Sequence, residues 1–259
     1  MSKSTTLITG ASMGIGLAFA HVFAQNGHDL ILVARSADKL KSISDELSAK
    51  YPAKVFYLAT DLAVPDAAQT VFKETSELGL TVDILVNNAG FGDFGLFAEN
   101  DWVKEQQMIS LNIATLTHLT KLFLPAMLTR KSGKILNLAS IASFFPGPNM
   151  AVYYATKAFV LSFSEALSSE LEGTGVSVTC LCPGPTASNF QAAAGMEDSK
   201  IIKGKKLPTS KEVAEYGYAE LMKGTVVAIH GFMNKMMVFS QRLTPRFVVR
   251  KMVKYLQAK

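Results

Sequence analysis

Short apolar runs alternate with longer amphipathic runs along most of the chain. The apolar runs are rich in Val, Ile and Leu and predict strands at residues 5–9, 29–34, 54–59, 82–87, 133–138, 176–181 and 226–229. The amphipathic runs predict helices near residues 14–26, 38–50, 66–78, 100–130, 151–172 and 210–223. Strands of this composition separated by helices are typical of a parallel sheet covered on both faces. The pattern therefore predicts a doubly wound α/β fold with a seven-stranded parallel sheet.

Two regions depart from this alternation. Residues 184–209 are rich in Gly, Pro, Ala and Lys and show weak periodicity, so we expect a long loop that acts as a lid. Residues 231–257 predict two short helices broken at Pro245. No linker or repeat divides the chain, which indicates a single domain over residues 1–259 with a C-terminal helical extension over about 231–259.

The composition, 49% hydrophobic and 18% charged over 259 residues, is typical of a globular protein. Residues 1–4 lead directly into the first predicted strand and leave no room for a signal peptide, and no apolar run approaches the ~20 residues of a membrane span. We therefore expect a cytoplasmic protein. Cys180 and Cys182 fall on one face of a predicted strand and match no zinc pattern, so we expect core residues and no metal site.

The net charge of +5 comes from the end of the chain. No acidic residue follows Glu220, whereas residues 221–259 contain eight basic ones. Two repeats in this region predict a basic amphipathic helix. Apolar residues follow the i, i+3, i+4, i+7 spacing at Val249, Met252, Val253 and Leu256, and basic residues recur every four positions at Arg242, Arg246, Arg250 and Lys254. This helix either packs on the body or a second subunit, or makes weak contact with an anionic membrane surface or an acidic carrier of a lipophilic substrate. We expect no nucleic acid partner, because no aromatic platform accompanies the charges.

Tyr153 and Lys157 are the strongest chemical signal in the chain. Their spacing places both side chains on one face of the helix predicted at 151–172. A fixed positive charge beside a phenol favours the phenolate and lowers its pKa from the usual ~10. With the Ser140 hydroxyl nearby, such a phenol can give a proton to a carbonyl oxygen or take one from an alcohol. The alternative is a chance pair on a solvated helix. Tyr154 is the weaker candidate, because its partner at the same spacing, Ala158, carries no charge.

A glycine-rich segment joins the first predicted strand to the first helix. It follows Thr9 and contains Gly10, Ser12, Met13, Gly14, Ile15 and Gly16. Glycines let the backbone approach a ligand closely, and the N-terminus of the following helix favours a phosphate. The segment therefore predicts a dinucleotide-binding loop, with spacing Gly-x-x-x-Gly-x-Gly.

Over residues 4–230 these features resemble the short-chain dehydrogenase/reductase superfamily in its single-domain form. The resemblance rests on the glycine-rich loop, Asn87-Asn88-Ala89-Gly90, Asn112, Ser140, Tyr153-x-x-x-Lys157 and Pro183-Gly184. Within the family the chain looks most like bacterial ketone reductases of the DltE type. The resemblance implies a Rossmann-like fold and an enzyme that transfers hydride between a nicotinamide cofactor and a ketone, an aldehyde or a secondary alcohol.

The resemblance also implies a role for each catalytic position. Tyr153 would be the general acid in reduction and the base in oxidation, and Ser140 would polarise the substrate carbonyl. Lys157 would bind the nicotinamide ribose and lower the pKa of the tyrosine. Asn112 would hold a water that links the lysine to solvent. Without the resemblance, Ser140 could be a strand-end cap and Asn112 a surface amide.

The resemblance further places the cofactor against several turns. Asn88, Ala89 and Gly90 would lie near the adenosine ribose, although a simple turn would also explain them. Asp61 and Leu62 would lie near the adenine ring. The nicotinamide carboxamide would contact Pro183, Gly184, Thr186 and Ser188, where Ser188 replaces a more frequent Thr and keeps the hydroxyl.

The end of the second predicted strand bears on the choice of cofactor. NAD enzymes usually have an acidic residue there, whereas this chain has Ala34, Arg35 and Ser36. Because a guanidinium binds phosphate, we predict that NADP(H) is preferred over NAD(H). One departure weakens this preference, since many NADP-binding relatives carry a basic residue where this chain has Met13.

Apolar side chains flank the predicted catalytic positions and favour a small hydrophobic carbonyl or alcohol substrate. They are Phe91, Phe94, Phe97, Phe144, Phe145, Pro146, Met150, Phe190 and Met196. Two alternatives stay open, namely a 3-oxoacyl thioester reductase of lipid metabolism and a non-catalytic regulatory protein that binds a dinucleotide. The resemblance also implies a homodimer or homotetramer formed through the helices near 100–130 and 151–172.

Overall fold

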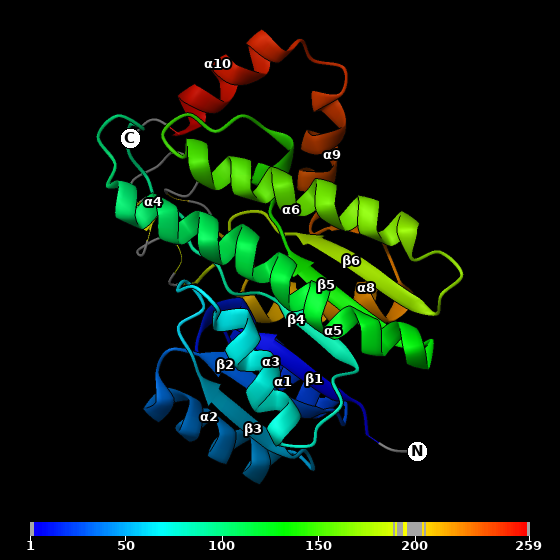
Figure 1. The fold of residues 1–259 in the computed structure, drawn as a ribbon. Coiled ribbons are helices and arrows are strands. Elements are labelled where there is room, and N and C mark those ends of the chain that lie inside the picture. Colours follow the sequence, from blue (N-terminus) through cyan, green and yellow to red (C-terminus); the bar gives the residue numbers. More distant parts are fainter. Residues whose placement is uncertain (1–2, 189, 191–193, 196–203, 205, 258–259) are drawn as a thin grey trace.

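The structure, a computed structural model, describes residues 3–188, 190, 194–195, 204 and 206–257. Within these residues lies one sheet of seven strands, all paired in parallel, in the order β3-β2-β1-β4-β5-β6-β7 (Figure 1). The strands are β1 (Thr5–Thr9), β2 (Asp29–Ala34), β3 (Val55–Ala59), β4 (Ile84–Asn87), β5 (Gly133–Leu138), β6 (Val176–Cys182) and β7 (Val227–Ile229). Each begins and ends within two residues of its predicted position.

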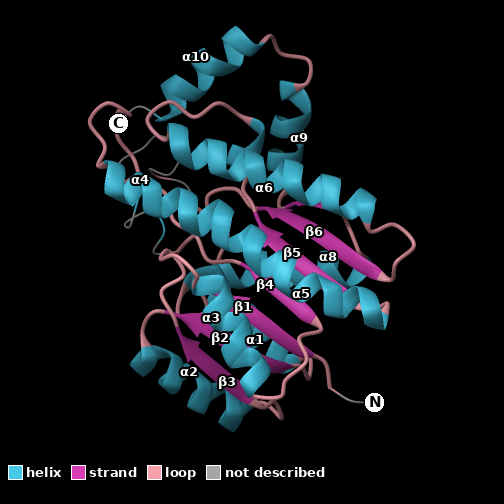
Figure 2. Cartoon of the chain, in the orientation of Figure 1, coloured by secondary structure: helices cyan, strands magenta, loops and turns pink. Residues whose placement is uncertain are grey.

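Helices cover both faces of this sheet (Figure 2). One face is packed by α1 (Gly14–Gln25), α2 (Ala37–Lys50) and α8 (Ser210–Lys223). The other is packed by α3 (Ala67–Glu77), α5 (Leu116–Arg130) and α6 (Ala151–Glu170). Because successive side chains of a strand point to opposite faces, Ile8 lies in the first core cluster and Leu7 in the second. The predicted doubly wound α/β fold is confirmed.

The single helix predicted at residues 100–130 is three consecutive segments. These are α4 (Trp102–Ile109), a π-helical segment (Ser110–Thr115) and α5. Periodicity alone does not reveal the change, since the helical rod continues through it. Short π-helical stretches are frequent at functional sites, and this one carries Asn112.

The end of the chain forms two helices, α9 (Phe232–Gln241) and α10 (Arg246–Gln257), with Pro245 at the break as predicted. Figure 1 shows them beyond α6, on the far side from α2 and β3. On α10, Val249, Val253 and Gln257 are buried. Among the described residues no helix is long and apolar enough to cross a membrane.

The two predicted core cysteines are confirmed as such. Cys180 and Cys182 are fully buried in β6, unbridged, with their sulfurs 3.8 Å apart. Of the predicted lid at 184–209 the structure describes only a part, in which Ala187 pairs with Thr209 in a short parallel bridge. Met196 lies outside the described residues.

The order of the strands creates the place for a site. The chain winds from β1 to β3 in one direction and from β4 to β7 in the other. At such a reversal the connections leave the sheet on opposite sides, and a crevice opens outside the carboxyl ends of the two central strands. The glycine-rich segment follows β1 and the turn Asn88–Gly90 follows β4, so both predicted cofactor segments lie at this crevice.

Candidate active site

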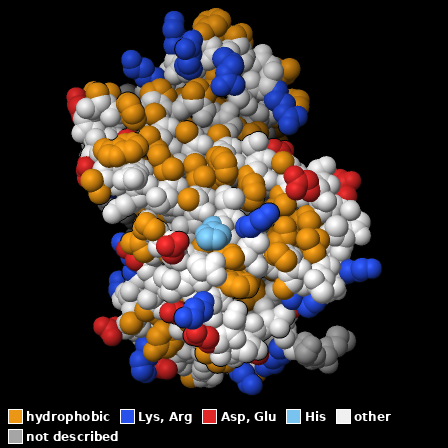
Figure 3. Space-filling model, in the orientation of Figure 1, with side chains coloured by type: hydrophobic (Ala, Val, Ile, Leu, Met, Phe, Trp, Pro, Cys, Tyr) orange, Lys and Arg blue, Asp and Glu red, His pale blue; other side chains and the backbone are white. Residues whose placement is uncertain are grey.

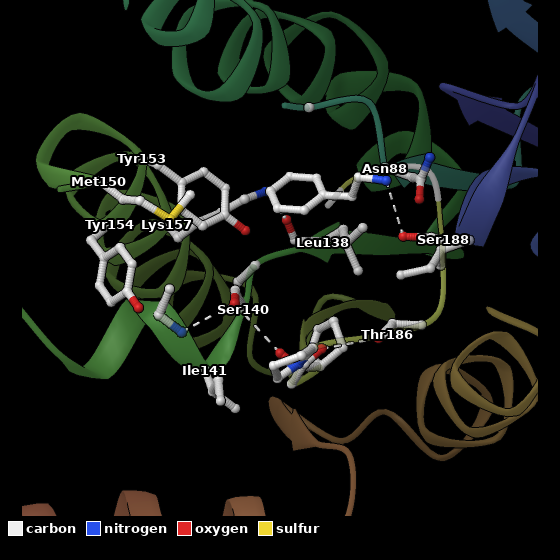
Figure 4. A pocket seen from close by; sticks show the side chains of 18 residues that line it. Asn88, Leu138, Ser140, Ile141, Met150, Tyr153, Tyr154, Lys157, Thr186 and Ser188 are labelled. Atoms are coloured by element: carbon white, nitrogen blue, oxygen red, sulfur yellow. Dashed lines mark hydrogen bonds between the residues drawn. The ribbon is translucent and has the colours of Figure 1, made fainter. Parts of the chain in front are cut away.

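A cavity of about 150 Å³ opens beyond the carboxyl end of β5, between α6 and the segment that follows β6 (Figure 4). The predicted site residues that line it are Ile15, Asn88, Gly90, Ser140, Tyr153, Lys157, Pro183, Gly184, Thr186 and Ser188. They come from segments more than 170 residues apart in the sequence. The fold therefore brings the predicted catalytic trio and much of the predicted cofactor set around one space.

Tyr153 occupies the first turn of α6 and is buried, with 8% of its surface exposed. Figure 4 shows its hydroxyl pointing toward Ser140. Burial raises the pKa of Tyr153 well above its ordinary value, and the hydrogen bond with Ser140 lowers it by a smaller amount. The expectation that Lys157 lowers this pKa is therefore wrong for the protein without cofactor, because desolvation dominates. The ammonium lies 5.9 Å from the centre of the phenol ring.

Ser140 lies just after β5 and is the N-cap residue of a short 3₁₀ helix, Ile141–Phe144. Its oxygen accepts a hydrogen bond from the backbone N–H of Ala142 at 3.1 Å and lies 3.5 Å from the carbonyl oxygen of Pro183. The capping interpretation is confirmed, and the same hydroxyl lines the cavity beside the phenol. Its role in polarising a substrate carbonyl stays a prediction.

Lys157 follows Tyr153 by one helical turn and is almost entirely buried. Its Nζ donates a hydrogen bond to the carbonyl oxygen of Leu138 at 2.7 Å. Burial lowers its pKa from 10.5 to about 8, because a charged group loses solvation in the interior. The strand end thus holds the amine in place at the floor of the cavity.

The buried lysine has a consequence for stability. Its folded pKa of about 8 lies below 10.5, so the unfolded chain binds a proton that the folded protein releases between these values. Stability therefore rises with pH through this window, by about 2 kcal/mol between about pH 7.5 and 9.5. At the lower pH the wild type bears the cost of burying a charged amine, whereas a Lys157→Met variant does not. We therefore expect the free energy of unfolding of the variant, relative to that of the wild type, to be about 2 kcal/mol lower at the higher pH than at the lower pH.

Urea unfolding of both proteins at the two pH values measures this change. Lys39→Met, at an exposed position, serves as the control and should show a difference from the wild type that is the same at both pH values. If the difference in stability between Lys157→Met and the wild type were also the same at both pH values, the proposed desolvation of the amine would be contradicted.

Asn112 is buried rather than on the helix surface. Its carbonyl oxygen accepts from the N–H of Phe91 at 3.2 Å, and its amide nitrogen donates to the carbonyl of Phe91 at 3.0 Å. The same nitrogen donates to the Thr156 hydroxyl at 3.1 Å. The side chain therefore joins the segment after β4 to α6, which holds Tyr153 and Lys157. Its predicted contact with a water stays a prediction.

The glycine-rich segment is packed too tightly for side chains at two positions. Gly10 has a φ of +66°, and a Cβ there would lie 2.8 Å from the side chain of Asn88. A Cβ on Gly16 would lie 2.2 Å from the carbonyl oxygen of Gly10. Met13 precedes α1 and makes no side-chain hydrogen bond to its first turn. The first turn of α1 therefore has no side-chain cap at its N-terminus, where a phosphate could accept from the backbone N–H groups.

Thr9 organises this segment, although the sequence analysis did not single it out as a site residue. Its hydroxyl accepts from the N–H groups of Asn88 and Ala89, both at 3.0 Å, and the Asn88 side chain donates to the Thr9 carbonyl at 2.7 Å. The Asn88 amide also reaches the carbonyl of Gly10 at 3.3 Å. Asn88 therefore clamps the two loops together, which a turn alone would not require.

The remaining predicted cofactor residues lie at the neighbouring strand ends, outside the cavity. Arg35 is exposed at the end of β2, before α2 begins. Asp61 is exposed after β3, and Leu62 is buried with its carbonyl held by the Thr115 hydroxyl at 2.7 Å. These residues therefore follow the carboxyl ends of β2 and β3, on the side of β1 away from the cavity.

The predicted apolar walls are only partly correct. Met150 and Phe190 line the cavity, and Phe91 and Phe94 pack against the cluster that contains Tyr153. The other described positions point elsewhere: Phe97 is 65% exposed, Phe144 packs beside β6, and Phe145 and Pro146 line a second cavity of about 370 Å³. Proximity in sequence to a catalytic residue therefore does not by itself place a side chain at the cavity.

Sequence reasoning also missed a wall formed by the end of the chain. Tyr154 lines the catalytic cavity, and its hydroxyl accepts a hydrogen bond from the amide of Gln257 at 2.6 Å. Gln257 is fully buried and its amide also contacts the sulfur of Met150 at 3.8 Å. No local signal could have joined residues 103 positions apart.

Comparison with known proteins agrees with this geometry. A family model described as short chain dehydrogenase matches residues 4–198. A very-long-chain 3-oxoacyl-CoA reductase of Phaeosphaeria nodorum is 41% identical over 182 residues, which are 68% of this chain and 52% of that protein. The chain thus matches about half the length of this relative. The oxidoreductase YvrD of Bacillus subtilis is 34% identical over 88% of this chain and 89% of its own.

A solved structure has the same architecture. The short-chain dehydrogenase from Sphingobium yanoikuyae in complex with NADPH superposes with a TM-score of 0.83 at 31% identity. The superposition covers 93% of this chain and 94% of the other. The similarity therefore extends over nearly the whole of both chains.

Proposed function

Since the chain belongs to the short-chain dehydrogenase/reductase family of NAD(P)-dependent oxidoreductases, we propose that it is an NADPH-dependent reductase of hydrophobic ketones and aldehydes. The reverse reaction would oxidise secondary alcohols. The observation that carries the proposal is the meeting of the Tyr153 and Ser140 hydroxyls and the Lys157 amine around one largely apolar cavity. The assignment to the DltE type stays a prediction.

The residues at the crevice fit a dinucleotide. Gly16 packs directly against the Gly10 carbonyl and the Asn88 amide, which holds the glycine-rich segment close to the turn after β4, and α1 begins there without a side-chain cap. Ile15, Asn88 and the segment Pro183–Ser188 connect this segment to the catalytic cavity. We assign the phosphates to the glycine-rich segment, the adenosine to the region of Asp61, Leu62, Ala89 and Gly90, and the nicotinamide to Pro183, Gly184, Thr186 and Ser188.

The chain's own residues would manage the proton and the charge on oxygen. A bound NADPH would supply the hydride. Tyr153 keeps its proton at neutral pH, because burial raises its pKa, and would donate that proton to the carbonyl oxygen. Ser140 would donate a hydrogen bond to the same oxygen as negative charge builds up on it. Lys157, buried beside the phenol, would hold the ribose hydroxyls.

The apolar lining supports a hydrophobic substrate. Ile141, Met150 and Phe190 line the cavity beside the catalytic hydroxyls. A 3-oxoacyl thioester is the second candidate, because several similar proteins, including that of Phaeosphaeria nodorum, are named very-long-chain 3-oxoacyl-CoA reductases. Oxidation of NADPH measured with a panel of apolar ketones, aldehydes and 3-oxoacyl thioesters separates the two.

A non-catalytic role in dinucleotide binding is the alternative of another class. A pure binding protein has no need of a buried phenol hydrogen-bonded to a serine, and this pair is intact. Binding of NADPH without turnover of any compound in the panel would favour this alternative.

The exposed guanidinium of Arg35 supports the preference for NADPH. We expect the wild type to use NADPH faster than NADH, and Arg35→Ala to reduce this ratio of kcat/KM about 10-fold. A hydrogen bond to a charged group contributes about 1.5 kcal/mol, which corresponds to such a factor. Steady-state kinetics with both cofactors measure the ratio.

Lys39→Ala provides a matched control, since it removes an equal charge from an exposed position of the neighbouring α2. It should leave the ratio unchanged. Faster use of NADH by the wild type, or an equal effect of the two substitutions, would contradict the role of Arg35.

We also propose that the protein forms a homodimer or homotetramer through the face made by α4, α5 and α6. Large apolar side chains are exposed on these helices, namely Trp102, Val103, Ile109, Leu128 and Phe159. Figure 3 shows hydrophobic side chains gathered over this face. Sedimentation equilibrium would distinguish two copies from four. The cytoplasmic location and the single-domain organisation stay predictions of the sequence.

A further inference from the structure

The outer side of α9 and α10 combines exposed apolar side chains with positive charge. We call it the tail surface. Its apolar members are Phe232, Met233, Met236, Phe239, Leu243, Phe247, Val248, Met252 and Tyr255. Its cations, all exposed, are Arg242, Arg246, Arg250, Lys251 and Lys254. Arg250 lies at the edge of this surface, where it also lines the second cavity. Lys235 of α9 is left out, because its Nζ lies over the ring of Tyr216 on α8, 5.8 Å from the ring centre. Apolar exposure this concentrated is unusual for a surface that faces only water.

The inner side of α10 fixes which way the tail surface points. Val249 and Val253 are 2% and 5% exposed, and Gln257 is fully buried against Tyr154 and Met150. Because these three positions share one side of the helix, Phe247, Val248 and Met252 are left outside. The packing of α10 on the rest of the protein therefore holds these apolar side chains on the outside. Their exposure does not come from a loosely attached helix.

The cations of the tail surface have no acidic neighbours on their own helices. No Asp or Glu follows Glu220 in the sequence, and none of these five cations forms an ion pair with a carboxylate among the described residues. Figure 3 shows the Lys and Arg side chains gathered beside hydrophobic ones over α10 and α9. This leaves a patch of one sign whose partner must supply negative charge.

A second copy of the chain does not satisfy this requirement through the same surface. In a twofold contact each patch meets itself, so cations would face cations while the apolar side chains were buried. The surface of an anionic lipid bilayer satisfies both features. Its headgroups attract the Lys and Arg side chains, and its interfacial region accepts Phe, Met and Tyr side chains.

We propose that the tail surface docks the protein on an anionic lipid bilayer. The bound helices lie in the plane of the interface, with the cations at the headgroups and Phe247 and Met252 below them. Because Gln257 at the end of α10 contacts two residues that line the catalytic cavity, the docked protein holds that cavity about one helix diameter, ~10 Å, from the lipid. The proposal concerns binding and does not depend on the proposed reaction.

Co-sedimentation of the full-length protein with vesicles tests the proposal. We expect binding to vesicles of phosphatidylcholine mixed with phosphatidylglycerol at low salt, and much weaker binding to phosphatidylcholine alone. Neutralising three cations in Arg250→Gln, Lys251→Gln, Lys254→Gln should weaken binding on the order of 100-fold, since each basic residue near such a surface contributes a factor of about 5.

A matched triple variant controls for net charge. Lys39→Gln, Lys54→Gln, Lys73→Gln removes the same charge from exposed positions on the opposite side of the molecule and should bind like the wild type. Phe247→Ser and Met252→Ser should remove the part of the binding that persists at high salt, because that part comes from apolar contact. Circular dichroism confirms that each variant is folded.

Four outcomes would overturn the proposal. They are no binding to anionic vesicles at low salt, equal weakening by the two triple variants, tighter binding to an RNA oligonucleotide than to the vesicles, and self-association in the absence of vesicles that Phe247→Ser abolishes. The last would assign the tail surface to a second copy of this chain.

Discussion

Replacing Tyr153 with Phe is expected to lower kcat/KM for carbonyl reduction by about 10²–10⁴-fold, the usual contribution of a positioned general acid. The substitution removes one hydroxyl from a buried ring that packs among Met150, Phe190 and Phe94, and leaves the ring itself in place. The affinity for NADPH should change little, because the glycine-rich segment and the Lys157 amine are untouched. Turnover with the best compound of the panel and titration of NADPH binding measure the two quantities.

Tyr154→Phe is the matched control for this experiment. It removes a hydroxyl from the adjacent residue, whose partner is Gln257 and not Ser140. We expect it to keep most of the activity, with a moderate change in KM because Tyr154 lines the cavity. Equal losses in the two variants, or an active Tyr153→Phe, would remove the basis for assigning the acid.

Replacing Gly16 with Ala is expected to weaken NADPH binding on the order of 100-fold, since forcing a methyl group into a packed site costs up to about 3 kcal/mol. The added Cβ would lie 2.2 Å from the carbonyl oxygen of Gly10 and 2.5 Å from the Asn88 amide. Neither contact is tolerable, so the segment must move away from the loop after β4. Asn88 would then lose its bonds to Thr9 and Gly10, which hold the two cofactor loops together.

Gly27→Ala separates this local effect from a general loss of stability. Gly27 also has a positive φ, +84°, but a Cβ there would meet nothing within 4 Å, and the residue lies in the turn at the other end of α1. Both variants should unfold at lower urea concentrations than the wild type, whereas only Gly16→Ala should lose cofactor affinity. Unchanged fluorescence titration of NADPH with Gly16→Ala would contradict the assignment of the loop.

Local pattern was sufficient for most of the secondary structure. The apolar runs of the inner strands are buried on both faces by helices, so each of these runs shows where its strand begins and ends. Local pattern was also sufficient to place Tyr153 and Lys157 on one helical face, because a single helical turn joins them regardless of what surrounds the helix. The π-helical segment around Asn112 escaped detection, since its residues continue the helical periodicity.

Charge and burial were harder to infer than position. A lysine one turn from a tyrosine suggests a lowered pKa for the phenol, yet in the folded protein burial raises it. The same burial lowers the pKa of Lys157 to about 8. Desolvation depends on how completely other segments cover a group, and that quantity has no local signature in the sequence.

The sequence by itself determined the order of the strands and helices, the glycine-rich segment and the shared helical face of the catalytic pair. Each of these depends on residues that are neighbours along the chain. Only the tertiary structure decided that Asn88 clamps the cofactor loops, that Phe144 and Phe145 point away from the cavity, and that Gln257 closes on Tyr154. These contacts join residues far apart in the sequence, and their geometry follows from the packing of the whole chain around one sheet.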